Sequence, residues 1–187
     1  GVFVDSHKIL SLLVKYLSQE KGMSGSIIKT FSTTNMLNRQ AEKYGLDIET
    51  TPIGFKYVAE KIVEGDVLVG GEESGGLAVK GHIPERDGIY IGLLIAEMMV
   101  KSDKPLSELV AELADEFGPH FQYRNDLHTS DEKKHAMMDY CKSESFKEIA
   151  GHKVVEWQQT DGVKHLTEDG SWLLVRPSGT EPVLRIY

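Results

Sequence analysis

Disulfide bonds and membrane spans are both missing from this sequence. Cys141 is the only cysteine among 187 residues, so no disulfide can form within the chain. Chains without disulfides are typical of a reducing compartment. The longest apolar run, residues 89–100, is shorter than a membrane span and contains Glu97. We therefore expect a cytoplasmic protein that has no membrane partner.

Positive charge is scarce. The 21 lysine and arginine residues are outnumbered by 29 aspartate and glutamate residues, which gives a net charge of -8. This balance argues against a general binding surface for nucleic acid. We therefore expect no nucleic-acid partner, although a local basic loop can still bind a phosphate within an acidic chain.

Metal and nucleotide signatures are absent too. None of the seven histidines stands at metal-ligand spacing beside carboxylates, so we expect no metal site within the chain. No G-x-G-x-x-G segment occurs. Residues 71–76 have the glycine spacing that opens a P-loop, but Leu77 and Ala78 stand where lysine and serine or threonine are required.

A regular alternation of strand and helix patterns runs as far as residue 118. It predicts a mainly parallel sheet with helices on both faces. Gly118 and Pro119 then break the chain, and the short strands that follow are separated by Asp-Gly turns typical of hairpins. The fold class is therefore α/β: a three-layer α/β/α domain over residues 1–118, followed by a smaller α+β domain with an antiparallel sheet over residues 119–187.

The expected elements have the following bounds. Strands are predicted over residues 27–31, 47–51, 67–69, 121–127, 153–158, 162–166, 172–175 and 183–187. Helices are predicted from an Asp5-Ser6 cap to a point before Gly22, and over residues 34–44, 55–63, 89–101, 105–117 and 131–142. The helix over residues 89–101 is apolar nearly all round, which predicts burial on several sides. Trp157 and Trp172 are expected in the core of the second domain.

The loop over residues 70–76, Gly-Gly-Glu-Glu-Ser-Gly-Gly, is the first candidate site. Its glycines let the backbone turn sharply and approach a ligand, while Glu72, Glu73 and Ser74 point at it. Carboxylates accept hydrogen bonds and a serine both accepts and donates them, which suits sugar hydroxyls. Glycine-rich acidic turns also occur commonly as solvated connections, so this pattern alone leaves both interpretations open.

A second loop, over residues 176–182, suits a phosphate. Arg176 offers a planar fork of donors, and Ser178 and Thr180 offer hydroxyls. Gly179 lets backbone N–H groups converge on an anion, and the flanking prolines stiffen the turn. One loop for hydroxyls and one for phosphate together suggest a sugar phosphate as the ligand.

With these loops in view, the chain resembles the α-D-phosphohexomutase family, which includes phosphoglucomutase and phosphomannomutase. Gly54-Phe55-Lys56 is similar to the family segment T-G-F-K. Residues 71–76 are similar to its G-E-x-S-G sugar loop, and residues 176–182 to its R-x-S-G-T-E-P phosphate loop. These motifs belong to the third and fourth of the family's four domains, so the chain resembles the C-terminal part of a mutase.

The resemblance implies a reaction. A phosphorylated serine donates its phosphoryl group to a hexose 1- or 6-phosphate, which makes a bisphosphate that returns the other phosphate. Magnesium and a hexose 1,6-bisphosphate activator would serve the full-length enzyme. The family motifs Thr-x-Ser-His-Asn-Pro and Asp-Gly-Asp-x-Asp are absent here. We therefore expect no catalytic residue in this chain, no cofactor bound by it and no activity from it alone; its partners would be a hexose phosphate and the N-terminal domains of the same polypeptide.

The resemblance also implies roles for individual residues. The sugar-binding residues would be Glu72, Ser74, Lys56 and Arg86. The phosphate-binding residues would be Arg176, Ser178, Gly179 and Thr180.

Several residues have a plainer interpretation as well. A lysine placed like Lys56 is commonly solvated, and Arg86 can simply pair with Asp87. Ser6-His7 echoes the family's phosphoserine motif, but the residues around it differ, so we interpret Ser6 as a helix cap.

The sequence leaves alternatives for the preferred hexose phosphate and for whether the chain is a fragment of a longer mutase. Gly76 stands where phosphomannomutase-like members of the family carry histidine, which favours glucose phosphate and leaves mannose phosphate open. Family members continue beyond Tyr187, so we expect the second domain to be truncated at its C-terminus. The alternative to a mutase fragment is a stand-alone, non-catalytic module that binds sugar phosphates; the first residues, Gly1 to Phe3, and an end within an apparent strand favour the fragment.

Overall fold

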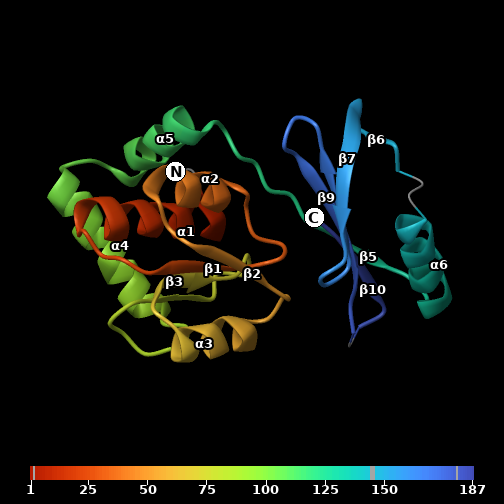
Figure 1. Ribbon diagram of the computed structural model, residues 1–187, viewed down its shortest axis with the longest axis horizontal. Helices are drawn as coiled ribbons and strands as arrows, with labels where there is room; N and C mark the ends of the chain where they lie inside the picture. Colours follow the sequence, from red (N-terminus) through yellow and green to blue (C-terminus); the bar gives the residue numbers. More distant parts are fainter. Residues whose placement is uncertain (2, 144–145, 180) are drawn as a thin grey trace. The chain divides into compact units, whose positions relative to one another are not determined.

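A computed structural model describes the whole chain apart from residues 2, 144–145 and 180. The chain divides into two compact units, Gly1–Phe121 and Gln122–Tyr187 (Figure 1). The boundary expected from Gly118 and Pro119 lies close to this division.

The first unit is built on a four-stranded sheet. Its strands are β1 (Ser26–Thr30), β2 (Ile48–Thr51), β3 (Val67–Gly71) and β4 (Leu77–Val79), in the spatial order β2-β1-β3-β4. The strand β1 runs parallel to both β2 and β3, and only β4 is antiparallel to its neighbour. The central strands are buried over nearly their whole length, as expected where helices cover both faces. The predicted mainly parallel sheet is confirmed.

Helices cover both faces of this sheet (Figure 1). On one face, α3 (Phe55–Glu64) packs Val58 against Ile28 and Ala78. The helices on the other face share one apolar core: α1 (Ser6–Lys15), continued by the π-helical turn η1 (Tyr16–Glu20), then α2 (Met36–Tyr44), α4 (Gly88–Ser102) and α5 (Leu106–Phe117). The three-layer α/β/α arrangement is therefore confirmed.

The expectation that α4 is buried on several sides is wrong. One face, made by Ile91, Leu94, Ile95 and Met98, packs into the core. On the opposite side Ile89 is 81% exposed, Leu93 64% and Val100 80%. The helix lies at the surface and contacts its unit along a single stripe, and a composition that is apolar all round does not reveal this.

The second unit is a six-stranded sheet with one helix against it. Its strands are β5 (Asn125–His128), β6 (Glu148–Ile149), β7 (His152–Gln158), β8 (Val163–Thr167), β9 (Trp172–Pro177) and β10 (Val183–Ile186), in the order β5-β10-β9-β8-β7-β6. Every neighbouring pair is antiparallel. The helix α6 (Asp131–Lys142) packs Met138 and Cys141 against Val163, Val175 and Leu184. The predicted α+β unit with an antiparallel sheet is confirmed.

Two details of the second unit differ from expectation. The strand predicted from residue 121 begins only at Asn125, and both Phe121 and Tyr123 are exposed. Trp157 is 36% exposed and is not a core residue. Both errors arise because aromatic residues favour strands and cores, while the sequence does not show that this part of the sheet is open to solvent.

Candidate functional site

The first candidate loop follows β3, at the sheet edge where the parallel strands β1 and β3 both end. Ligands of open α/β sheets commonly bind at this edge. Gly70 and Gly71 belong to β3 itself and not to the turn. A Cβ added to Gly70 would lie 2.5 Å from Val58 Cγ1 of α3, so this glycine serves the packing of helix on sheet. The turn proper is made by residues 72–76.

Within this turn, Glu72 is held close to Arg86. The Glu72 N–H donates to the Gly76 carbonyl at 3.0 Å, and the Gly75 N–H donates to the Glu72 carbonyl at 3.1 Å. Gly75 has φ +99°, a conformation that favours glycine. Glu72 is 7% exposed, and its Oε1 lies 3.9 Å from Arg86 Nη1. Ser74, by contrast, is exposed.

Gly76 leaves room for these two side chains. A Cβ at Gly76 would lie 2.7 Å from Glu72 Oε1 and 2.7 Å from Arg86 Cδ. A larger residue at this position would have to displace either the carboxylate or the guanidinium. The glycine therefore belongs with the Glu72–Arg86 arrangement of this loop.

The neighbouring carboxylate, Glu73, ties the loop to its support. Its Oε2 accepts hydrogen bonds from Oγ1 of Thr30, the last residue of β1, at 3.2 Å and from Oγ of Ser32, just beyond that strand, at 2.5 Å. Its backbone carbonyl accepts from the Ser6 hydroxyl at the start of α1. The expectation that Glu73 points at a ligand is wrong, because its Oε2 and its backbone carbonyl bond to hydroxyls of the scaffold.

The start of α1 also differs from expectation. Asp5 is the capping residue, and its Oδ1 accepts from the Lys8 N–H at 3.0 Å. Ser6 is the first helical residue, so the interpretation of Ser6 as the cap is wrong. His7 is buried, and its Nδ1 accepts from the Thr34 N–H at 3.2 Å. Burial lowers the pKa of His7, which favours the neutral imidazole that this hydrogen bond requires.

The side chain of Arg86 lies near the carboxylate of Glu72 and does not pair with that of its chain neighbour Asp87. Its Nε contacts Glu85 Oε1 at 3.1 Å, and its guanidinium lies 5.3 Å from the centre of the Phe55 ring. Lys56 follows Phe55 in the first turn of α3; it is exposed, with its Nζ 4.6 Å from the Tyr57 ring. The structure thus brings Arg86 next to Glu72 and leaves Lys56 at the surface.

Asp87 has a structural role instead. Its Oδ1 accepts from the N–H groups of Ile89 at 3.0 Å and Tyr90 at 2.9 Å, which caps α4. Its Oδ2 lies 2.8 Å from His82 Nε2. The backbone hydrogen bond from Tyr90 and the bond with His82 lower the pKa of Asp87. The suggested pairing of Arg86 with Asp87 is therefore wrong.

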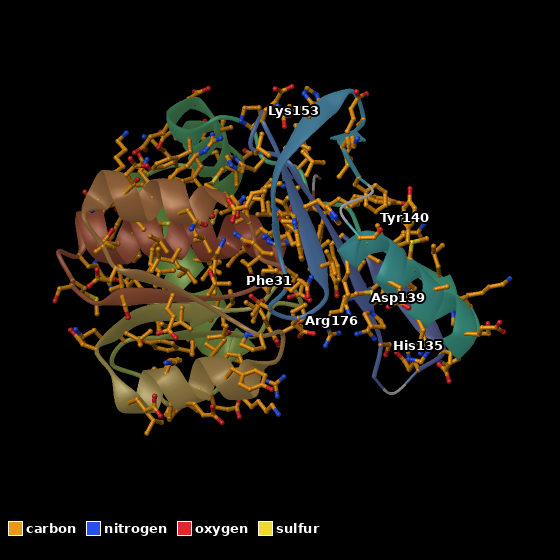
Figure 2. The ribbon with its side chains drawn as sticks, turned by 45° about the vertical axis from the view of Figure 1, so that its right-hand side comes forward. Phe31, His135, Asp139, Tyr140, Lys153 and Arg176 are labelled. Carbon is orange, nitrogen blue, oxygen red and sulfur yellow. The ribbon has the colours of Figure 1, made fainter. Side chains whose placement is uncertain are left out.

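The second candidate loop joins β9 to β10 and begins at Arg176. Arg176 is a residue of the strand β9. In Figure 2 the label of Tyr140 marks the helix α6, which packs on one face of this sheet. Because successive side chains of a strand alternate between faces, and Val175 packs on the α6 side, Arg176 points to the opposite face. Its Nε donates to Asp161 Oδ1 at 2.8 Å.

A glycine makes the Asp161 contact possible. Gly162 has φ +97°, and a Cβ there would lie 2.6 Å from the Val175 carbonyl and 3.0 Å from Arg176 Cβ. The turn between β7 and β8 can therefore lie directly on the backbone of β9. From the sequence, Asp161 and Gly162 were expected to form a hairpin turn; the structure adds that this turn orients Arg176.

Ser178 closes the loop by backbone and side-chain bonds. Its N–H donates to the Val183 carbonyl at 2.8 Å, and its Oγ accepts from the Glu181 N–H at 3.3 Å. Ser178 is buried, while Gly179 is exposed, and a Cβ at Gly179 would have no atom within 4 Å. Thr180, the remaining expected residue, lies outside the described residues.

Among the residues that the structure describes, no three histidine, cysteine, aspartate or glutamate side chains come together so that they could hold a metal ion. The residues present therefore do not fit a magnesium site. In the same described part of the chain, no helix is both long and apolar enough to cross a membrane.

Two family models match the chain. The model described as "Phosphoglucomutase/phosphomannomutase, alpha/beta/alpha domain III" matches residues 5–117. The model described as "Phosphoglucomutase/phosphomannomutase, C-terminal domain" matches residues 130–187.

Curated relatives match over the whole chain. A phosphoglucomutase/phosphomannomutase of Thermococcus kodakarensis is 33% identical over 187 residues, which are 100% of this chain and 38% of the relative. A phosphoglucosamine mutase of Methanococcus maripaludis is 32% identical over 100% of this chain and 39% of its own length. The chain therefore spans about two fifths of the relatives that it matches.

Solved structures share the fold. A Thermus thermophilus protein assigned as a phosphomannomutase has a TM-score of 0.78 and 32% identity, over 99% of this chain and 37% of its own. The phosphoglucomutase parafusin of Paramecium has a TM-score of 0.81 at 24% identity, over 98% of this chain and 36% of its own, and at that identity it supports the fold alone.

Proposed function

The chain belongs to the phosphoglucomutase/phosphomannomutase family, and from this premise we propose that it is the sugar- and phosphate-binding part of a phosphohexomutase. The full-length polypeptide would interconvert a hexose 1-phosphate and the matching hexose 6-phosphate through a bisphosphate. Phosphoryl transfer depends mainly on positioning and charge stabilisation. Binding loops can therefore occupy domains that contribute no catalytic residue.

The observation that carries this proposal is the Glu72 carboxylate beside Arg86 at the carboxyl edge of a parallel sheet. Arg86 Nη1 lies 3.9 Å from Glu72 Oε1, which places a positive charge beside the carboxylate. An ionised carboxylate accepts hydrogen bonds from two adjacent sugar hydroxyls without donating any. Ser74, exposed on the same turn, would add a hydroxyl that donates or accepts, and Lys56 would extend the site at the start of α3.

The second loop would hold the phosphate that does not react in a given step. Arg176, already oriented by Asp161, supplies a charged donor. Ser178, Gly179 and Thr180 would supply hydroxyl and backbone donors. A hexose phosphate that is turned over end for end presents a phosphate and equatorial hydroxyls in either orientation, so the same two loops would serve both half-reactions.

The full-length enzyme would use magnesium and a hexose 1,6-bisphosphate activator. Since the described residues of this chain do not fit a metal site, the metal ligands and the phosphorylated serine would come from the N-terminal domains of the same polypeptide. In this proposal the chain alone is inactive and works in the cytoplasm as part of that polypeptide.

The experiment is a mutase assay on the full-length polypeptide with the 1-phosphates of glucose, mannose and glucosamine. The three sugars are compared because relatives of similar identity include phosphoglucosamine mutases as well as a phosphoglucomutase/phosphomannomutase. We expect turnover of glucose 1-phosphate, and an upstream reading frame that encodes Thr-x-Ser-His-Asn-Pro and Asp-Gly-Asp-x-Asp. A polypeptide without either motif and without turnover would instead be the non-catalytic binding module.

A further inference from the structure

A buried lysine lies directly behind the candidate phosphate loop. Lys134, in the first turn of α6, is 8% exposed. Its Nζ donates to the carbonyl oxygen of Ser178 at 3.3 Å and to that of Glu181 at 3.1 Å. It also lies 2.7 Å from Asp131 Oδ1. A buried ammonium is costly unless its donors are satisfied, and here two of its partners belong to the loop itself.

These contacts fix how the loop presents its backbone. The carbonyls of Ser178 and Glu181 flank the turn, and both point toward α6. In a planar trans peptide the C=O and N–H groups point in opposite directions, and the described chain has no cis peptide. The bond from Lys134 to the Ser178 carbonyl therefore directs the Gly179 N–H away from α6, toward the open side of the loop.

The same contacts turn the carbonyl oxygens of Ser178 and Glu181 away from the place of a bound phosphate. A free carbonyl oxygen that faced the turn would repel a bound phosphate, whereas a carbonyl bonded to an ammonium faces away from it. Packing alone would not require a charge here, since a methionine would fill the same space without a buried ion.

We propose that Lys134 is a positioning residue that orients the Gly179 N–H of the phosphate loop through the Ser178 carbonyl and holds the other end of the loop through the Glu181 carbonyl. The inference rests on the proposed function, because it concerns the same phosphate of the hexose phosphate. It adds a residue from outside the loop that the loop sequence does not reveal.

The test compares Lys134→Met with Lys133→Met in the full-length polypeptide. Lys133 is the adjacent, exposed lysine on α6, so it controls for loss of one positive charge. The measurements are the dissociation constants of glucose 6-phosphate and of inorganic phosphate, the kcat and KM of turnover, and the melting temperature. We expect Lys134→Met to raise both dissociation constants and KM about tenfold, with a smaller change in kcat, as for one backbone donor that no longer points at the phosphate. Lys133→Met should leave them unchanged.

A second variant and a reference variant complete the design. Lys134→Gln keeps a shorter donor for one carbonyl and should give an intermediate dissociation constant, which matters if Lys134→Met fails to fold. If Arg176→Met weakens phosphate binding while folded Lys134→Gln and Lys134→Met bind like the wild type, the inference on Lys134 is overturned and the proposed function stands. If Arg176→Met also binds like the wild type, the proposed function itself is contradicted.

Discussion

At the scale of residues, two adjacent carboxylates have different surroundings. Glu72 is beside Arg86, while Glu73 accepts hydrogen bonds from Thr30 and Ser32. The sequence shows two glutamates in one turn, and only the hydroxyls contributed by β1 and the segment after it distinguish them. The family motif points to Glu72 as a sugar-binding residue, but it carries no information about the support behind the neighbouring Glu73.

This difference predicts that one alanine variant loses stability and that the other loses turnover. Glu73→Ala should lower the free energy of unfolding by about 1–3 kcal/mol, because the Thr30 and Ser32 hydroxyls lose a charged acceptor. Glu72→Ala should leave stability within about 1 kcal/mol, as for a carboxylate without scaffold hydrogen bonds from hydroxyls, yet reduce mutase turnover in both directions. Urea unfolding and the mutase assay, applied to both variants of the full-length polypeptide, measure this. Equal stability of the two variants would contradict the anchoring role of Glu73.

Arg176 gives a second prediction at this scale. Arg176→Met should weaken glucose 6-phosphate binding by about tenfold to a hundredfold, the loss of one charge-assisted bond of about 1.5–3 kcal/mol. Methionine retains much of the apolar stem, so the sheet should stay folded. Calorimetric titration of the full-length variant gives the affinity, and circular dichroism gives the fold. A folded variant with wild-type affinity would remove Arg176 from the binding site.

At the scale of elements, α4 shows what a helical pattern can and cannot predict. Its predicted bounds, residues 89–101, followed from the apolar run and agree closely with Gly88–Ser102, but the buried side did not follow from it. Leu93 and Leu94 are adjacent in sequence and both leucine, yet they are 64% and 5% exposed. Which of them is buried depends on the shared core, to which α1 contributes from a distant part of the sequence and α5 from the next helix along the chain.

The pair Leu93 and Leu94 therefore makes a matched test. Leu94→Ala should lower the free energy of unfolding by about 2–5 kcal/mol because it opens a cavity in the core. Leu93→Ala should change it by no more than about 0.5 kcal/mol, as at other surface positions. Chemical denaturation of the 187-residue chain compares them. A larger loss from Leu93→Ala would mean that α4 packs with its other face.

Charge also links the helices, through Glu116 of α5. Its carboxylate lies 2.8 Å from Lys15 of α1 and 2.9 Å from Lys43 of α2, and it accepts from the Tyr44 hydroxyl at 2.9 Å. Burial alone would raise the pKa of Glu116, but the hydrogen bonds from Lys15, Lys43 and Tyr44 lower it from 4.5 to about 2. The sequence places these residues on three helices without showing that they meet.

This cluster predicts a dependence of stability on pH. A carboxyl group whose pKa is lower in the folded state stabilises the fold fully above its unfolded pKa of 4.5 and loses that contribution as the pH falls toward about 2. Glu116→Gln lacks the titrating group, so its deficit relative to the wild type should be larger at about pH 7 than at about pH 3. Urea unfolding at the two pH values measures the deficit, and a deficit independent of pH would contradict the cluster.

At the scale of the whole molecule, the fold classes of both units were predictable from the sequence. Alternating strand and helix patterns determine a three-layer unit, and short strands with Asp-Gly turns determine an antiparallel one. The two loops were found because each is a short, continuous motif. Lys134 and Asp161 contact residues of the second loop that are far away in the sequence, and local patterns do not carry that information.

In the proposed function, each of the two loops of this chain contributes to hexose phosphate binding within a longer polypeptide. The most direct test is the kcat/KM for glucose 1-phosphate of the full-length protein, compared with its Glu72→Ala and Arg176→Met variants. We expect measurable mutase turnover in the wild type and a fall of at least about tenfold in each folded variant. A wild-type protein without turnover, or variants with the wild-type kcat/KM, would contradict it.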